Sequence, residues 1–567
     1  MTGNVAIGVV LAFVLVLTSC SPGQRVESGS TGSSSTETSP SSGPKRIVAA
    51  MMGEPTSLVA RLNTGQISVP GAGVLEQLVN ASLSEYNEDG GLQPQLAEAV
   101  PSLENGLWKL FPDGRMETSW KIRAGARWHD GTPITADDFV FATVVDLDKD
   151  LPIVKPSGYG WVERVEAPDP RTVTVTWNRP YIDADAMFTY DFATPLPKHL
   201  LEDAFLNDKA RFTALPYWSQ EFVGTGPFRL KEYVPGSSYT IRASDDYIAG
   251  RPKIDEIEVR FILDLNTVMT NLVAGTVELT IGRGFAIEQA LQLRDQWREG
   301  RMIYRPRSWV ALHPQFMDPS PAIVTDLQFR KALLYGTDRQ QLVDSLQGGI
   351  VPIGHIYLSP SEPEYKDVEN SVVRYEYDPR RAVQMIEGLG YSRGPDGIFR
   401  DAAGQRLAVE VRSNGEAITE KAIIPVANFW TQLGVATEPV LVPPQRQTDR
   451  EYVATFPSFR MMRQPNTASQ INRIRSNLTP TAENRYVGSN YARYTSPELD
   501  ALIDRFLTTI PKQERMRAFG DTMRYISEQL NVVGLFHDAE FMFASNRLQN
   551  ISGGEIRVWD VPKWEAK

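Results

Sequence analysis

The residues best suited to chemistry gather in one short stretch of the chain. His129 and Asp130 precede Asp137 and Asp138, and imidazole and carboxylate groups together can bind a metal or transfer protons. The remaining histidines are scattered, and none belongs to a His-Glu-x-x-His motif: His199, His313, His355 and His537. The chain also has no Gly-x-Ser-x-Gly turn for a nucleophilic serine. We therefore expect no catalytic residue, no metal site and no cofactor.

Ordinary structural signals explain the same stretch. The residues from Trp120 alternate apolar and polar side chains as a half-buried strand does, and Trp128 begins a second short strand. Asp130 and the glycine after it predict a turn. A helix capped by Thr135 follows, with Asp137-Asp138 in its first turn, where carboxylates favour the positive end of the helix dipole. This interpretation assigns the acidic residues to a turn and a cap.

Two elements are expected farther along the chain. Residues 162–177 alternate around the turn Asp169-Pro170-Arg171, which predicts a β-hairpin. Its buried face would carry Val173, Val175 and Trp177. Residues 183–192 are expected to form a helix before the chain leaves this region at Pro195.

Several motifs resemble those of one protein family, the family 5 extracellular solute-binding proteins, which are the peptide- and nickel-binding receptors of ABC importers. The first matches that family's signature at Trp120, Ile122, Arg123, Gly125, Trp128, His129, Asp130, Gly131, Pro133, Thr135, Ala136 and Asp138. A second motif, Gly224-Thr225-Gly226-Pro227-Phe228, leads into a strand, whereas a phosphate-binding loop would lead into a helix. A third begins at Tyr377-Asp378-Pro379 and continues through a helix to Leu389.

The resemblance implies an α/β, two-lobed periplasmic-binding-protein-like fold (type II, cluster C-like), with an additional inserted domain and a hinge between the lobes. A chain of 567 residues is long enough for several domains. The expected division is a signal peptide at 1–20, a tether at 21–44, lobe 1 from 45–88, 196–300 and 531–567, an inserted domain at 89–195, and lobe 2 at 301–530.

The amino-terminal segment predicts export and anchoring. Residues 5–17 form an apolar run that is too short to span a bilayer and suits a signal peptide. Leu17-Thr18-Ser19-Cys20 resembles a lipobox, which implies that Cys20, the one cysteine, is lipidated. Residues 21–44, rich in Ser, Thr, Gly and Pro, would form a flexible tether. The protein is therefore expected outside the cytoplasm, anchored to the outer face of the cell membrane.

Ligand contacts are expected on loops between the lobes. The resemblance implies that peptide-binding members hold the ligand's α-amino group with an aspartate in lobe 2, but residues 456–475 here contain no Asp or Glu. Arginines occupy the stretch instead, and we expect Arg460 and Arg463 to bind a carboxylate or another anion; the structural alternative is that they line a solvated loop. The other residues predicted to contact the ligand are Tyr159, Trp161, Trp309, Phe536 and His537.

The function implied by the resemblance is capture of peptides or similar polar solutes and their delivery to an ABC permease and its ATPase, with the protein acting as a monomer. A nickel chelate, an anion or a sugar is the alternative ligand. A secreted hydrolase on a similar scaffold and a surface receptor without a transport role are the alternative functions. The net charge of −11 argues against nucleic acid as a partner, because nucleic acids select clustered Lys and Arg.

Overall fold

The computed structural model describes residues 43–62, 69–151, 153, 157–282, 284–551 and 558–567. The predicted signal peptide, Cys20 and nearly all of the tether lie outside these residues. Residues from 44 onward form one compact unit. Among the described residues, no helix is both long enough and apolar enough to cross a membrane.

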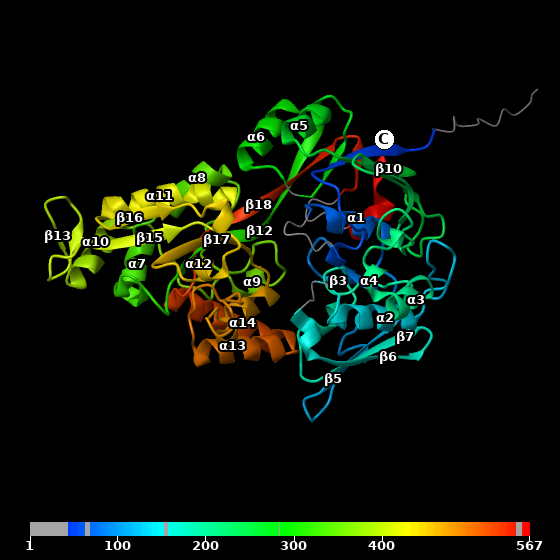
Figure 1. The fold of residues 1–567 in the computed structure, drawn as a ribbon, viewed down its shortest axis with the longest axis horizontal. Coiled ribbons are helices and arrows are strands. Elements are labelled where there is room, and N and C mark those ends of the chain that lie inside the picture. Colours follow the sequence, from blue (N-terminus) through cyan, green and yellow to red (C-terminus); the bar gives the residue numbers. More distant parts are fainter. Residues whose placement is uncertain (1–42, 63–68, 152, 154–156, 283, 552–557) are drawn as a thin grey trace, which may run out of the picture. The chain divides into compact units, whose positions relative to one another are not determined.

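A ten-stranded mixed sheet is the central element of the fold (Figure 1). Its strand order is β16-β15-β17-β12-β18-β11-β1-β10-β9-β8. The strands are β1 (Arg46–Met51), β8 (Phe228–Val234), β9 (Ser238–Ala243), β10 (Glu256–Phe261), β11 (Leu279–Ile281), β12 (Gly300–Pro314), β15 (Ala408–Arg412), β16 (Ala436–Val440), β17 (Phe459–Pro465) and β18 (Val533–Ser545).

The two longest strands join the two halves of this sheet. β12 and β18 pair antiparallel from Gly300 and Ser545 at one end to Leu312 and Val533 at the other (Figure 1). Near the first end β18 also pairs with β11, and toward the other end β12 pairs with β17. The strands from β11 to β8 therefore belong to the first lobe and β15 to β17 to the second. The chain passes between the lobes along β12 and β18.

Helices cover both faces of the sheet. Those of the first lobe are α1 (Ala72–Val79), α3 (Lys198–Asn207), α4 (Lys209–Phe212), α5 (Leu265–Val273) and α6 (Ile287–Gln296). Those of the second lobe are α7 (Leu327–Tyr335), α8 (Arg339–Gln347), α9 (Tyr365–Val368), α10 (Pro379–Gly388), α11 (Ala417–Leu433), α12 (Arg450–Ala454), α13 (Pro497–Thr508) and α14 (Lys512–Gln529).

Three apolar clusters divide the core between the faces of the sheet. Successive side chains of a strand point to opposite faces, so Val310 and Phe543 join one cluster, while Ala311 joins a second and Ala544 a third. The first cluster contains residues of α5 to α8, α10 and α11, and it includes strands of both lobes. The second also contains residues of α13, α14 and the inserted domain.

The inserted domain contains a separate antiparallel sheet, ordered β4 (Trp108–Leu110), β5 (Met116–Lys121), β7 (Thr172–Trp177) and β6 (Val162–Asp169), and helix α2 (Ala136–Leu147). The predicted hairpin is confirmed as β6 and β7, and Val173, Val175 and Trp177 are fully buried. Trp120 of β5 packs edge-on against Phe188, with ring centroids 5.0 Å apart. The remaining strands form short pairs: β2 (Ser84–Tyr86) with β3 (Leu92–Pro94), β13 (Ser392–Arg393) with β14 (Phe399–Arg400), and β19 (Leu548–Gln549) with β20 (Glu565–Ala566).

Two of the expected elements are wrong. Trp128 does not begin a strand, because its N–H donates to the Thr132 carbonyl and its own carbonyl accepts from Gly131, which closes a tight turn. Residues 183–192 do not form a helix beyond a single 3-10 turn at Ala184–Ala186. The Ile182 N–H just before this turn donates to the Leu507 carbonyl of α13. Tertiary contacts therefore determine the backbone conformation here and override the local preference for a helix.

Helix α2 begins with a capping box. The Asp138 carboxylate accepts the Thr135 N–H at 2.8 Å, and its second oxygen accepts the Lys198 N–H that begins α3, at 3.0 Å. Trp128 Nε1 donates to the same carboxylate at 3.3 Å. Asp138 is buried, whereas Asp137 is exposed. One carboxylate therefore fixes α2, the start of α3 and the turn at Trp128.

We expect Asp138→Ala to lower the free energy of unfolding by about 1–3 kcal/mol, because it leaves one buried and two partly buried donors without an acceptor. Urea denaturation followed by tryptophan fluorescence would measure the change. Asp137→Ala is the matched control and should cost only a few tenths of a kcal/mol. Equal losses in the two variants would show that the helix dipole, and not the buried contacts of Asp138, accounts for the effect.

Candidate ligand-binding site

A cavity of about 400 Å³ lies between the two lobes. Aromatic, acidic, basic and small polar side chains line it together, as is typical of sites for polar ligands. The first lobe and its inserted domain contribute Tyr86, Asn87, Gly90, Tyr181, Asp183, Ala186, Asp191 and Phe192. The second lobe and the crossing strand β12 contribute Arg305, Arg307, Glu362, Pro363, Glu364, Pro465, Thr467, Ala468, Ser469 and Gln470.

A β-bulge places Arg307 at this cavity. The ladder between β12 and β18 shifts register between Pro306 and Ser308, so Arg307 is an extra residue of β12 at this point. A bulge bends its strand and re-aims a side chain, and bulges are frequent beside functional sites. The Pro306 carbonyl accepts hydroxyl groups from Ser359 at 2.5 Å and from Ser361 at 2.7 Å.

These contacts fix the second-lobe wall. The Ser359 N–H donates to the Asn466 carbonyl at 2.9 Å, and the Arg305 guanidinium donates to the Ser361 carbonyl at 2.6 Å. Ser359 is fully buried. The bulged strand, the loop before α9 and the segment after β17 are therefore connected by hydrogen bonds. This connection positions the acidic residues that follow Ser361 at the cavity.

A tight turn between β2 and β3 forms part of the opposite wall. The Asn87 side chain accepts the Gly91 N–H at 2.8 Å, and Gly90 adopts a left-handed conformation with φ of 79°. A Cβ atom at Gly90 would lie 2.7 Å from Cδ of Pro363 in the second lobe. The walls approach so closely here that only glycine fits.

Two layers of aromatic residues form the rest of the first-lobe wall. Tyr181 and Phe192 line the cavity. Behind them, Trp161 packs edge-on against Tyr181 with centroids 4.3 Å apart, and Tyr159 packs against Phe192 at 5.9 Å. The Tyr159 hydroxyl donates to Asp146 at 2.9 Å. The two predicted residues Tyr159 and Trp161 thus support the lining from behind.

The predicted arginines lie within the sheet. Arg460 on β17 is 6% exposed and donates to the Val453 carbonyl at 3.2 Å, and burial lowers its pKa to about 10. Arg463 reaches across β12 and forms ion pairs with Asp538 at 2.5 Å and Glu540 at 3.2 Å on β18. Burial opposes its charge, but the nearby carboxylates, Asp538 foremost and Glu540 next, together outweigh this and raise the Arg463 pKa.

The other three predicted residues belong to the core at the crossing strands. Trp309 is 1% exposed and packs edge-on against Tyr357, with centroids 5.2 Å apart. Phe536 and His537 are fully buried. His537 Nδ1 lies 3.1 Å from the Asn466 amide nitrogen, and burial lowers the His537 pKa to about 3. Within the described residues, none of the seven predicted side chains lines the interlobe cavity, and their roles in ligand binding stay predictions.

The residues that first suggested acid–base chemistry have structural partners. The Gly224 N–H donates to His129 Nδ1 at 3.2 Å, and His129 Nε2 lies 2.9 Å from the Gly226 carbonyl. Burial lowers the His129 pKa to about 4, so the ring is neutral. Asp130 pairs with His199 at 2.8 Å. The described residues contain no group of three His, Cys, Asp or Glu side chains arranged to hold a metal ion.

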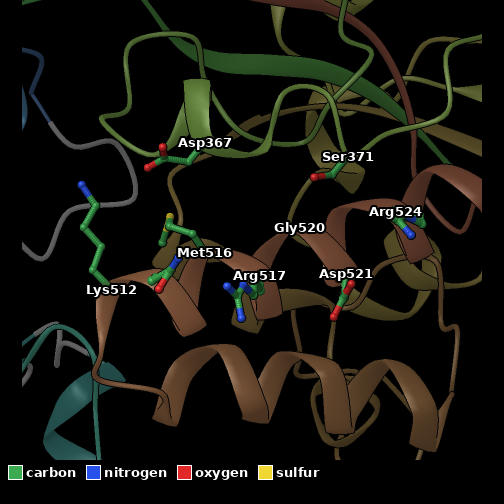
Figure 2. Close-up of a pocket in the computed structure, with 9 residues that line it drawn as sticks. Asp367, Ser371, Lys512, Met516, Arg517, Gly520, Asp521 and Arg524 are labelled. Carbon is green, nitrogen blue, oxygen red and sulfur yellow. The ribbon is translucent and has the colours of Figure 1, made fainter.

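A second hollow, of about 560 Å³, lies on the second lobe alone (Figure 2). Figure 2 shows its floor on α14, with Lys512, Arg517 and Arg524, and its far side at Asp367 and Ser371. Both sides belong to one lobe, so movement of the lobes cannot enclose a ligand there. The interlobe cavity is therefore the better candidate for the ligand site.

Comparison with known proteins identifies the family of this chain with two lobes around a polar cavity. Residues 91–484 match the model of the bacterial extracellular solute-binding proteins, family 5 (middle). The chain belongs to this family. Family 5 proteins are extracytoplasmic substrate-binding proteins of ABC importers. The resemblance of the signature motif is thereby confirmed.

The relatives of this family 5 protein bind different ligands. It is 23% identical to the oligopeptide-binding protein AppA of Bacillus subtilis over 99% of this chain and 98% of that one. The oligopeptide-binding protein of Thermus thermophilus, solved with a pentapeptide, superposes with a TM-score of 0.67 at 22% identity and covers 92% of this chain and 96% of that one. NikZ of Campylobacter jejuni, solved with nickel and L-histidine, superposes with a TM-score of 0.69 at 19% identity and covers 92% of this chain and 100% of that one. These likenesses confirm the two-lobed α/β fold.

Sequence reasoning missed the residues that line the cavity. Asp183 and Asp191 fall in the segment expected to be a helix, and Glu362 and Glu364 fall in a loop that carried no motif. One signal was available, because acidic residues recur within the otherwise apolar run 181–193. Charged residues in such a run are unusual unless a cavity or a partner receives them.

Proposed function

We propose that this family 5 protein captures peptides or similar polar solutes in the interlobe cavity and delivers them to the permease and ATPase of an ABC importer. It acts as a monomer and catalyses no reaction. The observation that carries the proposal is the cavity itself, whose polar and aromatic walls come from two lobes between which the chain crosses along two adjacent strands of the sheet, β12 and β18. Relatives named for oligopeptide binding support the choice of ligand.

Capture would follow from movement about the crossing strands. The ladder between β12 and β18 is irregular at Arg307 and again between Val310 and Ala311. Irregular pairing bends a strand more easily than a regular ladder does, so these two points suit a hinge. Closing the lobes removes water from the cavity, which strengthens hydrogen bonds and charge interactions with the ligand. A ligand that binds both walls favours the closed state.

Calorimetric titration after a thermal-shift screen tests this function. The screen would contain tripeptides to pentapeptides, the nickel–histidine complex and disaccharides, and we expect at least one peptide to bind with Kd of roughly 1 μM or tighter. Arg307→Ala should weaken binding, whereas Arg517→Ala, in the hollow on α14, should leave it unchanged. Chemical conversion of the bound ligand, or loss of affinity only in Arg517→Ala, would contradict the proposal.

Anchoring by Cys20 is the second part of the proposal. It is supported by the apolar run 5–17, by the lipobox-like residues that end at Cys20, and by the polar tether that follows. Expressed with its full leader in a bacterial host, the protein should incorporate labelled palmitate and sediment with membranes. Cys20→Ala should lose the label and appear in the soluble fraction. Labelling that survives this substitution would contradict the anchor.

A further inference from the structure

A third cavity, of about 250 Å³, lies where the inserted domain meets the first lobe. Two sequence motifs converge on it, because its lining includes residues 127–131 of the signature stretch and Thr225-Gly226 of the second motif. Arg229 of β8 and two residues of the loop after β9, Asp246 and Tyr247, also line it. No described residue lines both this cavity and the one between the lobes. The third cavity is therefore a separate site.

Hydrogen bonds of His129 hold the two walls of this cavity together. Its Nδ1 accepts the Gly224 N–H at 3.2 Å, and its own backbone N–H donates to the Gly224 carbonyl at 2.9 Å. Burial lowers the pKa of His129 to about 4, and the charge of Arg229 adds to the decrease, so the ring is neutral and lies near the guanidinium. Because both walls belong to the first lobe and its inserted domain, the cavity does not depend on movement of the second lobe.

The Arg229 side chain has an unsatisfied donor at this cavity. Its Nε is buried and has no hydrogen-bond acceptor among the described residues. Its ion pair with Asp245 is 3.7 Å long, and Arg251 pairs with the same carboxylate group at 2.8 Å. Buried donors in native proteins are nearly always satisfied, so an acceptor within the cavity would complete the contacts of Arg229. A carboxylate suits this position, since its two oxygens match the fork of a guanidinium.

An unpaired carboxylate lines the same cavity. Asp246 forms no ion pair within 4.0 Å in the part of the chain that the structure describes. Asp130, the other acidic residue of the lining, is already engaged by His199 at 2.8 Å and by the Thr132 N–H at 2.9 Å. Arg229 and Asp246 therefore present opposite charges to one cavity without pairing with each other.

A ligand that carries both charges would satisfy the two side chains together. The cavity has about eight times the roughly 30 Å³ that one water molecule occupies in the liquid, so it has room for a small organic molecule. Buried side chains provide its apolar surface: Leu96, Trp128 and Tyr247. A free α-amino acid combines a carboxylate, an ammonium group and a side chain that such a surface can contact.

We propose that the third cavity binds a free α-amino acid as its zwitterion, with the carboxylate on Arg229, the ammonium group on Asp246 and the side chain against Trp128. This site goes beyond the proposed importer function, because it lies outside the interlobe cavity and does not require closure of the lobes. Bound there, the amino acid would contact both the inserted domain and the first lobe.

Amino acids that are blocked at one end test each half of the proposal. The probes are L-alanine, L-serine and L-leucine, their N-acetyl forms, which lack the ammonium group, and their amides, which lack the carboxylate. Calorimetric titration of the full-length protein at pH 7 would measure the affinities. We expect at least one free amino acid to bind roughly tenfold more tightly than both of its blocked forms. Equal affinities of the three forms, or no binding of any free amino acid, would overturn the proposal and leave peptide capture intact.

Substitutions assign each charge to its residue. Arg229→Gln should reduce the preference over the amide to about threefold or less and keep the preference over the N-acetyl form, and Asp246→Asn should do the opposite. Because Asp246 is exposed, Asp246→Asn tests the site even if Arg229→Gln fails to fold. Arg307→Ala, in the interlobe cavity, should retain both preferences. Loss of the preferences only in Arg307→Ala would place the amino acid between the lobes and overturn the proposal.

Discussion

Replacing Arg463 by methionine is expected to lower the free energy of unfolding by about 3–5 kcal/mol, because it leaves a buried carboxylate without its cation. Arg463 and Asp538 are each only 10–12% exposed at their side chains, and Glu540 extends the pair. The Gln347 amide also donates to Asp538, at 2.7 Å, and this contact cannot replace the lost charge. Urea denaturation followed by fluorescence and circular dichroism would measure the loss.

The control for this substitution is Arg505→Met on α13. Arg505 pairs with Asp521 of α14, but the two side chains are 52% and 47% exposed, so removing that pair should cost no more than about 1 kcal/mol. Peptide affinity should be unchanged in folded Arg463→Met, since the guanidinium is engaged within the sheet. A loss of affinity without a loss of stability would instead assign Arg463 to the ligand, as the sequence led us to expect.

Gly90→Ala should weaken peptide binding by roughly 5- to 150-fold. The added methyl group would lie 2.7 Å from Cδ of Pro363 when the lobes are together, and overpacking of this kind costs about 1–3 kcal/mol. Separation of the lobes would relieve this clash, so the substitution should shift the population away from the arrangement described here and lower the apparent affinity. Titration with Ala-Lys-Ala would measure the affinity, and small-angle X-ray scattering would measure the ligand-induced compaction.

Gly114→Ala separates the clash from the backbone effect. Gly114 has φ of 86°, close to the 79° of Gly90, and no atom lies within 4 Å of its added Cβ. Both substitutions therefore carry the same cost, about 1 kcal/mol, of placing alanine in the left-handed region. Only Gly90→Ala should affect binding. A matched decrease in affinity in both variants would show that the lobes do not close on Gly90 and Pro363.

The features that could be predicted from the sequence are those with local signals. The hairpin of β6 and β7 follows from alternation around a turn, and the cap of α2 follows from Thr135 and Asp138, three residues apart. The resemblance over the signature stretch identified the family, because the residues of such a motif form turns and helix caps that proteins of the same fold share. None of these signals depends on contacts between segments that are distant in the sequence.

The cavity could not be predicted because it depends on contacts between segments that are distant in the sequence. The Arg307 bulge is a property of the register between β12 and β18, which are far apart in the sequence. Arg463 resembled a ligand-binding residue because residues 456–475 contain no acid, but its acidic partners lie on β18, beyond the neighbouring strand β12. Likewise, Asp183 and Glu364 line one cavity, although they lie far apart in the sequence and belong to different lobes.

The crossing strands have a mechanical consequence. A pair of hydrogen-bonded strands contains no freely rotating joint, so rotation of the lobes must be taken up as torsion of β12 and β18 and stored as elastic energy. A restoring torque then opposes displacement from the resting angle in either direction, and the ligand must supply the work of deformation. The stiffness of the two strands is set by their pairing and their bulges. It thereby contributes to the affinity of this protein for its ligand and to the rate of ligand release.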